Sequence, residues 1–125
     1  MLTTAIHVAL GGALGAMMRY VSGVAILKLF GAGFPLGVLF VNVLGSGIMG
    51  MCVVYLGQKG LNHLNPFLMT GILGGFTTFS AFSLEAYTLF ERGQVGAAAL
   101  YVSLSVGLSL AALVVGIFLM RWVLA

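Results

Sequence analysis

Residues Gly71–Ser83 read GILGGFTTFSAFS and lie in the middle of a long apolar run, Pro66–Phe90. Adjacent glycines weaken a helix through backbone entropy, and the two threonines that follow are β-branched. The stretch therefore predicts a break at Gly74–Thr78 in an otherwise continuous helix. Inside a membrane such a break frees backbone carbonyls suited to a cation, and broken helices near the midplane often mark transport sites. The alternative is a kink that serves packing alone.

The composition around this stretch indicates an integral membrane protein. Apolar residues make up 62% of the 125-residue chain and charged residues only 6%, whereas soluble domains are about one quarter charged. A membrane-spanning helix needs about 20 apolar residues. The sequence therefore predicts an all-α membrane protein, a single domain of four spans with short connections. The expected spans are residues 4–29, 35–56, 66–90 and 95–123.

Small residues recur four positions apart in every expected span. The pairs are Gly11/Gly15, Gly12/Ala16, Ser46/Gly50, Gly71/Gly75 and Ala112/Gly116. In lipid, such pairs let helices approach closely. They predict tight packing and self-association.

The few positive charges do not cluster, which argues against nucleic-acid binding, and most fall near span ends as interfacial anchors. With four spans, Lys59 and Arg121 lie on one side of the membrane and Lys28 and Arg92 on the other. Because the two sides carry equal numbers of positive charges, the count does not predict which side faces the cytoplasm. Either so few charges make the count uninformative, or the protein inserts in both directions.

Several polar side chains fall inside the expected spans, where they are costly and therefore functional candidates. Arg19 either snorkels to the interface or supplies positive charge that draws anions toward a pathway. Asn42 either bonds a neighbouring helix or donates its amide to a small anion. Glu85 is the only acid within a span, and its role stays open.

The last span carries hydroxyl groups on one stripe, at positions i, i+4 and i+8, namely Tyr101, Ser105 and Ser109. They either bond back to their own helix or form a lane of donors. After the expected break, Phe79 and Phe82 share a face, with Ser80 beside them. Phenylalanine ring edges carry partial positive charge and can contact an anion, although such rings more often pack against lipid or protein.

No nucleophile–base pair, paired carboxylate or phosphate-binding loop occurs in the sequence, so catalysis has no support and an enzyme is not expected.

Three motifs together resemble the Fluc family of fluoride channels, also called CrcB. They are Gly11–Tyr20 (GGALGAMMRY), Phe40–Ser46 (FVNVLGS) and Gly74–Ser83 (GGFTTFSAFS). The third motif is highly specific, the second moderately so, and their order and spacing cover nearly the whole chain. The resemblance implies a fluoride-selective channel in the cell membrane that exports fluoride passively and protects against its toxicity.

The resemblance also implies an antiparallel, dual-topology homodimer embedded in lipid, with a structural sodium ion at its interface. The backbone carbonyls of Gly74 and Thr77 would bind sodium. Fluoride would meet Phe79, Phe82, Asn42, Ser80 and the hydroxyl groups of Tyr101, Ser105 and Ser109. Arg19 would be the vestibule cation.

Two other classes of protein compete with this interpretation. Small proton-coupled multidrug exporters are also four-span dimers, but they need a carboxylate that is typically in the first span, where this chain has none. A structural subunit of a larger membrane complex would explain the small-residue pairs. It would leave the break in the third span without a purpose.

Overall fold

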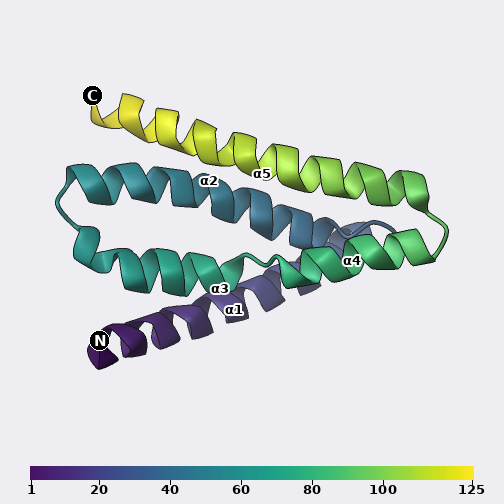
Figure 1. The fold of residues 1–125 in the computed structure, drawn as a ribbon, viewed down its shortest axis with the longest axis horizontal. Helices are drawn as coiled ribbons and strands as arrows, with labels where there is room; N and C mark the ends of the chain where they lie inside the picture. Colours follow the sequence, from purple (N-terminus) through teal and green to yellow (C-terminus); the bar gives the residue numbers. More distant parts are fainter.

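The computed structural model describes residues 1–125 and is helical in all four spans. The helices are α1 (Leu2–Phe30), α2 (Leu36–Gln58), the short η1 (Asn62–Leu64), η2 (Pro66–Leu73), α3 (Gly74–Phe76), α4 (Ser80–Glu91) and α5 (Val95–Leu124). Both chain termini lie at the same end of the bundle as the α2–η1 connection (Figure 1). Four helical stretches are long and apolar enough to cross a membrane, which confirms the expected all-α fold with four spans.

The third span is interrupted at the two predicted threonines, but not at the predicted glycine pair. Its first part, η2, is a π-helix that continues into α3. Thr77 is extended, with φ −90° and ψ 161°, and regular helix resumes only at Ser80. The expectation that the glycine pair begins the break is wrong, because Gly74 has helical φ −63° and ψ −37° and Gly75 belongs to α3. The break lies at residues 77–79, which includes both threonines.

Gly75, the second glycine of the pair, instead allows α1 to approach the third span closely. A Cβ on Gly75 would lie 2.6 Å from the carbonyl oxygen of Gly12 and 3.1 Å from the amide nitrogen of Ala16. A Cβ on Gly15 would collide with the carbonyl of Ile72. Glycine therefore serves backbone contact here, and the conformational freedom of Gly75 is not used.

Helices α2 and α5 meet in the same way at the other side of the bundle. A Cβ on Gly50 would collide with the carbonyl of Leu113, and one on Gly116 with the carbonyl of Gly47. The small-residue pairs thus account for tight packing within one chain. Self-association of the chain stays a prediction.

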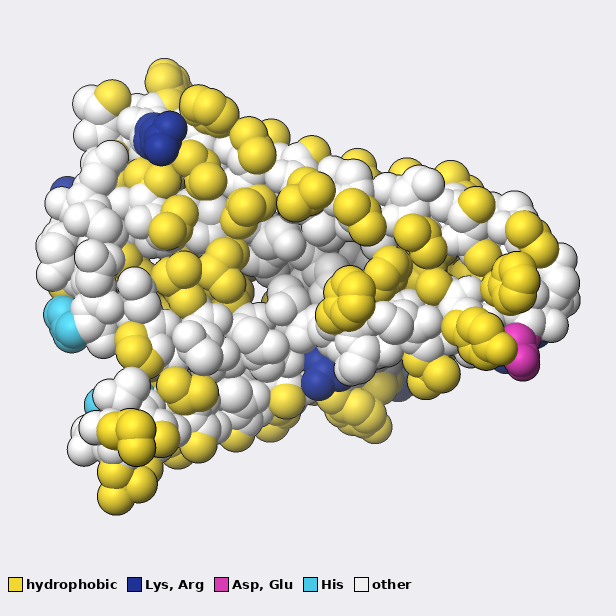
Figure 2. Space-filling view, in the orientation of Figure 1, with side chains coloured by type: hydrophobic (Ala, Val, Ile, Leu, Met, Phe, Trp, Pro, Cys, Tyr) yellow, Lys and Arg dark blue, Asp and Glu magenta, His cyan; other side chains and the backbone are white.

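Very little of the molecule is buried within one copy of the chain. Only 16 of 125 residues are buried, and large apolar side chains are exposed along all four spans. Figure 2 shows apolar side chains spread over one face, with few charged groups among them. Because burial of apolar surface drives folding in water, a bundle that leaves this much exposed fits lipid or a protein partner as its surroundings.

Candidate functional site

The break in the third span is held by a side chain from α2. Asn42 donates from Nδ2 to the carbonyl of Thr78 at 2.9 Å, and its Oδ1 accepts from the amide of Thr78 at 2.8 Å. Both backbone groups of Thr78 are therefore satisfied where no helical partner exists. The hydroxyl of Thr78 accepts from the amide of Ala81 at 3.1 Å and caps the start of α4.

Arg19 also forms a hydrogen bond next to this break. Its Nε donates to the carbonyl of Gly75 at 3.0 Å, and its side chain is partly buried. The last carbonyls of a helix carry partial negative charge, which a cation stabilises. Arg19 thus supports the end of α3.

Several carbonyls at the break receive no hydrogen bond, among them those of Gly74 and Thr77. The amide of Thr77 donates to Leu73, that of Thr78 to Asn42, and that of Ala81 to the hydroxyl of Thr78. No donor reaches the carbonyl oxygens of Gly74 or Thr77, and both residues line a cavity. Free carbonyl oxygens are ligands that hard cations accept, so the residues present fit the sodium ion that the resemblance implies.

The cavity beside the break has a volume of about 510 Å³ and is here called the central cavity. Figure 2 shows a hollow near the middle of the face that it draws, between α5 and the broken helix. Polar groups reach the cavity from three elements of the fold. Its polar lining residues are Asn42, Ser46, Thr77, Thr78, Ser105 and Ser109.

Phe79 and Phe82 also line the central cavity, with their ring centroids 5.5 Å apart. They differ sharply in exposure, because Phe79 is 76% exposed and Phe82 only 8%. Phe82 is held on its other side by Tyr101, at 5.4 Å between centroids. The first ring therefore lies at the open surface of one chain, and the second lies in its core.

The hydroxyl stripe of α5 divides between the cavity and the core. Ser105 and Ser109 line the central cavity, and the buried hydroxyl of Ser105 has no hydrogen-bond partner. Tyr101 does not line it: its side chain is fully buried, and its hydroxyl donates to Glu85 at 3.0 Å. Ser80 is also outside the cavity, with its hydroxyl exposed and 3.4 Å from that of Thr78.

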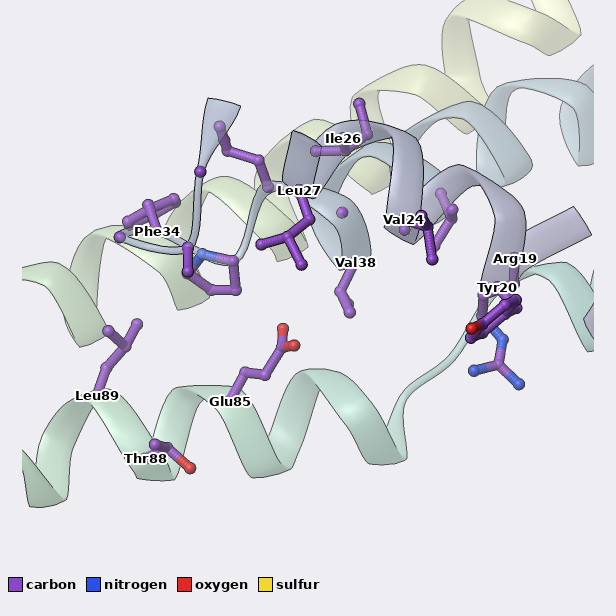
Figure 3. Close-up of a pocket in the computed structure, with 18 of the residues that line it drawn as sticks. Arg19, Tyr20, Val24, Ile26, Leu27, Phe34, Val38, Glu85, Thr88 and Leu89 are labelled. Carbon is purple, nitrogen blue, oxygen red and sulfur yellow. The ribbon is translucent and has the colours of Figure 1, made fainter. Parts of the chain in front are cut away.

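A second cavity of about 530 Å³, the end cavity, opens beside the connection between α1 and α2. Glu85 points from α4 across it toward Val38, with Arg19 at one end and Phe34 near the other (Figure 3). Phe34 contacts Tyr101 edge to face, with centroids 5.6 Å apart. Since Tyr101 also contacts Phe82, the rings of Phe34, Tyr101 and Phe82 form a row of contacts that runs from the end cavity to the central cavity.

Three residues that shape the break and the aromatic contacts are not among the predicted site residues. In the sequence, Thr78 predicts only a weakened helix, yet a hydroxyl three positions before Ala81 is a recognisable capping signal. Gly45 admits the side chain of Thr77, since a Cβ there would collide with its methyl group. Phe34 lies in a connection, and no local pattern predicts its contact with Tyr101.

Comparison with known proteins identifies the family. Residues 6–117 match the family described as "CrcB-like protein, Camphor Resistance (CrcB)". The chain is 63% identical to the protein named "Fluoride-specific ion channel FluC" of Ruegeria sp. (strain TM1040), over 99% of each chain. It is 60% identical to the protein of that name from Cereibacter sphaeroides, over 97% of each chain, and 56% identical to that of Roseobacter denitrificans, over 94% of this chain and 95% of the relative. The chain therefore belongs to the CrcB-like family.

Proposed function

We propose that this multi-pass membrane protein is a fluoride-specific channel that exports fluoride passively from the cell and so protects it from fluoride toxicity. One observation supports this most directly: none of the residues that line the central cavity is charged. A conducting site must bind its ion weakly enough to release it. Neutral donors and ring edges meet that demand for a small, strongly hydrated anion.

The proposed contacts follow from the lining of the central cavity. Asn42 uses one amide hydrogen on Thr78, which leaves the other for fluoride. The unpartnered hydroxyl of Ser105 is a second donor, and Ser109 a third. Phe79 and Phe82 present ring edges to the ion. Tyr101 is the member of the hydroxyl stripe nearest the end cavity, because it contacts Phe34. Arg19 provides positive charge in the end cavity.

The proposal places two copies of the chain side by side in opposite orientations. The balanced charge tally allows both insertions, and the 76% exposure of Phe79 leaves most of its ring to be covered by another surface. The exposed hydroxyl of Ser80 would join the pathway at this contact. Inverted halves are a common way to build a membrane transport site.

The free carbonyls of Gly74 and Thr77 would hold a sodium ion between the two copies. One chain offers two such oxygens, and two copies together would offer four. Sodium would supply a fixed positive charge that offsets the carbonyl dipoles and keeps the two breaks together. The residues of each chain would set the site by keeping the break open, chiefly through Asn42 and Thr78.

Purified protein in liposomes loaded with fluoride tests this function. Fluoride is expected to leave down its own gradient once charge is balanced by a potassium ionophore, and collapse of any proton gradient should not change the rate. A fluoride electrode reports the efflux. Strict dependence on a proton gradient would replace the channel by a coupled transporter.

Dual insertion predicts that a tag at the C-terminus is accessible from both sides of one membrane. Intact cells or sealed vesicles labelled with an impermeant reagent should show roughly half of the tags protected, because the balanced charges favour neither orientation. A variant with extra lysines beside Lys59 is the control, since it should shift the population to one side. Complete protection or complete labelling of the unmodified protein would refute dual topology.

A further inference from the structure

The end cavity carries an uneven set of fixed charges. Its lining contains two cations, Arg19 and Arg92, and one carboxylate, Glu85. With one negative charge set against two positive charges, a single positive charge remains. Removal of Arg92 would leave the lining balanced, so the sign of this cavity depends on that residue.

Arg92 lies at the outer end of the cavity. Glu85, Thr88 and Leu89 line it from α4, and Arg92 lines it from just beyond the end of that helix. They stand at positions i, i+3, i+4 and i+7, which share one helix face. Leu89 is buried, whereas Arg92 is exposed and follows the last helical residue. Residues Gly31–Pro35 of the α1–α2 connection line the same end. Arg92 is therefore a cation at the mouth of the cavity.

The two carboxylates of the chain are both engaged with tyrosines. Glu85 accepts from the hydroxyl of Tyr101 at 3.0 Å, and Glu91 accepts from that of Tyr87 at 3.1 Å. Arg19 is tied by its Nε to the carbonyl of Gly75. Arg92 takes part in none of these contacts, so its guanidinium is the one in this cavity that is free to act on ions arriving from solution.

We propose that Arg92 is a capture residue for fluoride: it concentrates the anion at the mouth of the end cavity and sets how fast ions enter. This inference rests on the proposed channel function and adds a role in the entry step. Clefts lined by one sign of charge raise the local concentration of the opposite ion and its association rate.

The position of Arg92 suits capture better than tight binding. Seven residues of helix separate it from Glu85, which is about 10 Å along the axis at 1.5 Å per residue. An exposed charge acts over the Debye length, about 30 Å in 10 mM salt and about 3 Å in 1 M salt. Its effect on entry should therefore be strong in dilute salt and should vanish in concentrated salt.

The test compares Arg92→Gln with Lys28→Gln in full-length protein reconstituted in liposomes. Lys28 is a cation in the last turn of α1, at the same end of the bundle, and it does not line the end cavity. Initial fluoride efflux is measured at subsaturating fluoride in about 10 mM and about 1 M background salt, chosen to span long and short Debye lengths. The background anion is large and impermeant.

Arg92→Gln is expected to slow efflux by about two- to threefold in dilute salt and to equal the unmodified protein in concentrated salt. Arg92→Lys should retain the rate. Lys28→Gln removes a charge at the same end of the bundle but outside the end cavity, so it should slow efflux in dilute salt less than Arg92→Gln does. Equal rates for Arg92→Gln and the unmodified protein in dilute salt would overturn the capture role. So would a loss that persists in concentrated salt, because that would indicate a structural effect. Absence of fluoride efflux from the unmodified protein would instead overturn the channel function itself, and the capture role with it.

Discussion

Replacing Phe82 with isoleucine is expected to lower fluoride efflux by roughly 100-fold or more, since a partly dehydrated anion finds no solvent to replace a lost contact. Phe82 lines the central cavity and is only 8% exposed. Isoleucine keeps the residue apolar and of similar size, so folding should cost less than about 1.5 kcal/mol. It has no polarised ring edge to offer the ion. Fluoride efflux from liposomes measures the loss, and size-exclusion chromatography checks that the protein stays assembled.

Phe90→Ile is the matched control for this substitution. Phe90 lies in the same helix, α4, is 55% exposed and lines neither the central cavity nor the end cavity. It should conduct fluoride as the unmodified protein does. If Phe82→Ile and Phe90→Ile were equally active, the Phe82 ring would be a packing residue and not part of the ion pathway.

The second large effect is expected at Asn42, where substitution should damage the fold itself. Asn42→Leu would leave the amide and the carbonyl of Thr78 without partners, because both bond to the Asn42 side chain. An unsatisfied buried polar group costs about 1–3 kcal/mol. The two groups of Thr78 are only part-buried, so together they should cost about 2 kcal/mol, the low end of the summed range. The variant should lose most of its thermal stability in detergent and its fluoride efflux together.

Asn62→Leu controls for the change from amide to hydrocarbon. Asn62 begins η1 near the end of the span, is exposed and donates no side-chain hydrogen bond to the break. Thermal unfolding followed by loss of the folded species should show Asn62→Leu close to the unmodified protein. Equal unfolding temperatures for the two variants would show that the Asn42–Thr78 pairing does not hold the break.

The four spans were predictable because their signal is local. Each span is a continuous apolar run, and no soluble fold can satisfy a chain with so few charges. The position of the break depends on more than the local sequence. Gly74 and Gly75 both remain helical, and α1 packs directly on Gly75, where a Cβ would lie 2.6 Å from the carbonyl oxygen of Gly12. A sequence pattern indicates that a helix is weak, but a neighbouring helix determines which residue leaves it.

In the candidate site, too, some features follow from the local sequence and others depend on packing between helices. Asn42, Phe79, Phe82, Ser105 and Ser109 line the central cavity together. Tyr101 shares the helical stripe of the two serines but lies in the core, because the end of α5 that carries it packs against α4 and Phe34. Helical periodicity places residues on one face, yet it does not tell where along that face a cavity ends.

The proposed function requires that the uncharged central cavity conduct fluoride and reject other halides. The most direct test is a planar bilayer that contains the purified protein, with equal concentrations of fluoride on one side and chloride on the other. The proposed function predicts a current carried by fluoride alone and a reversal potential displaced far from zero, in the direction that opposes fluoride flow. A reversal potential near zero, with chloride carrying as much current as fluoride, would contradict it.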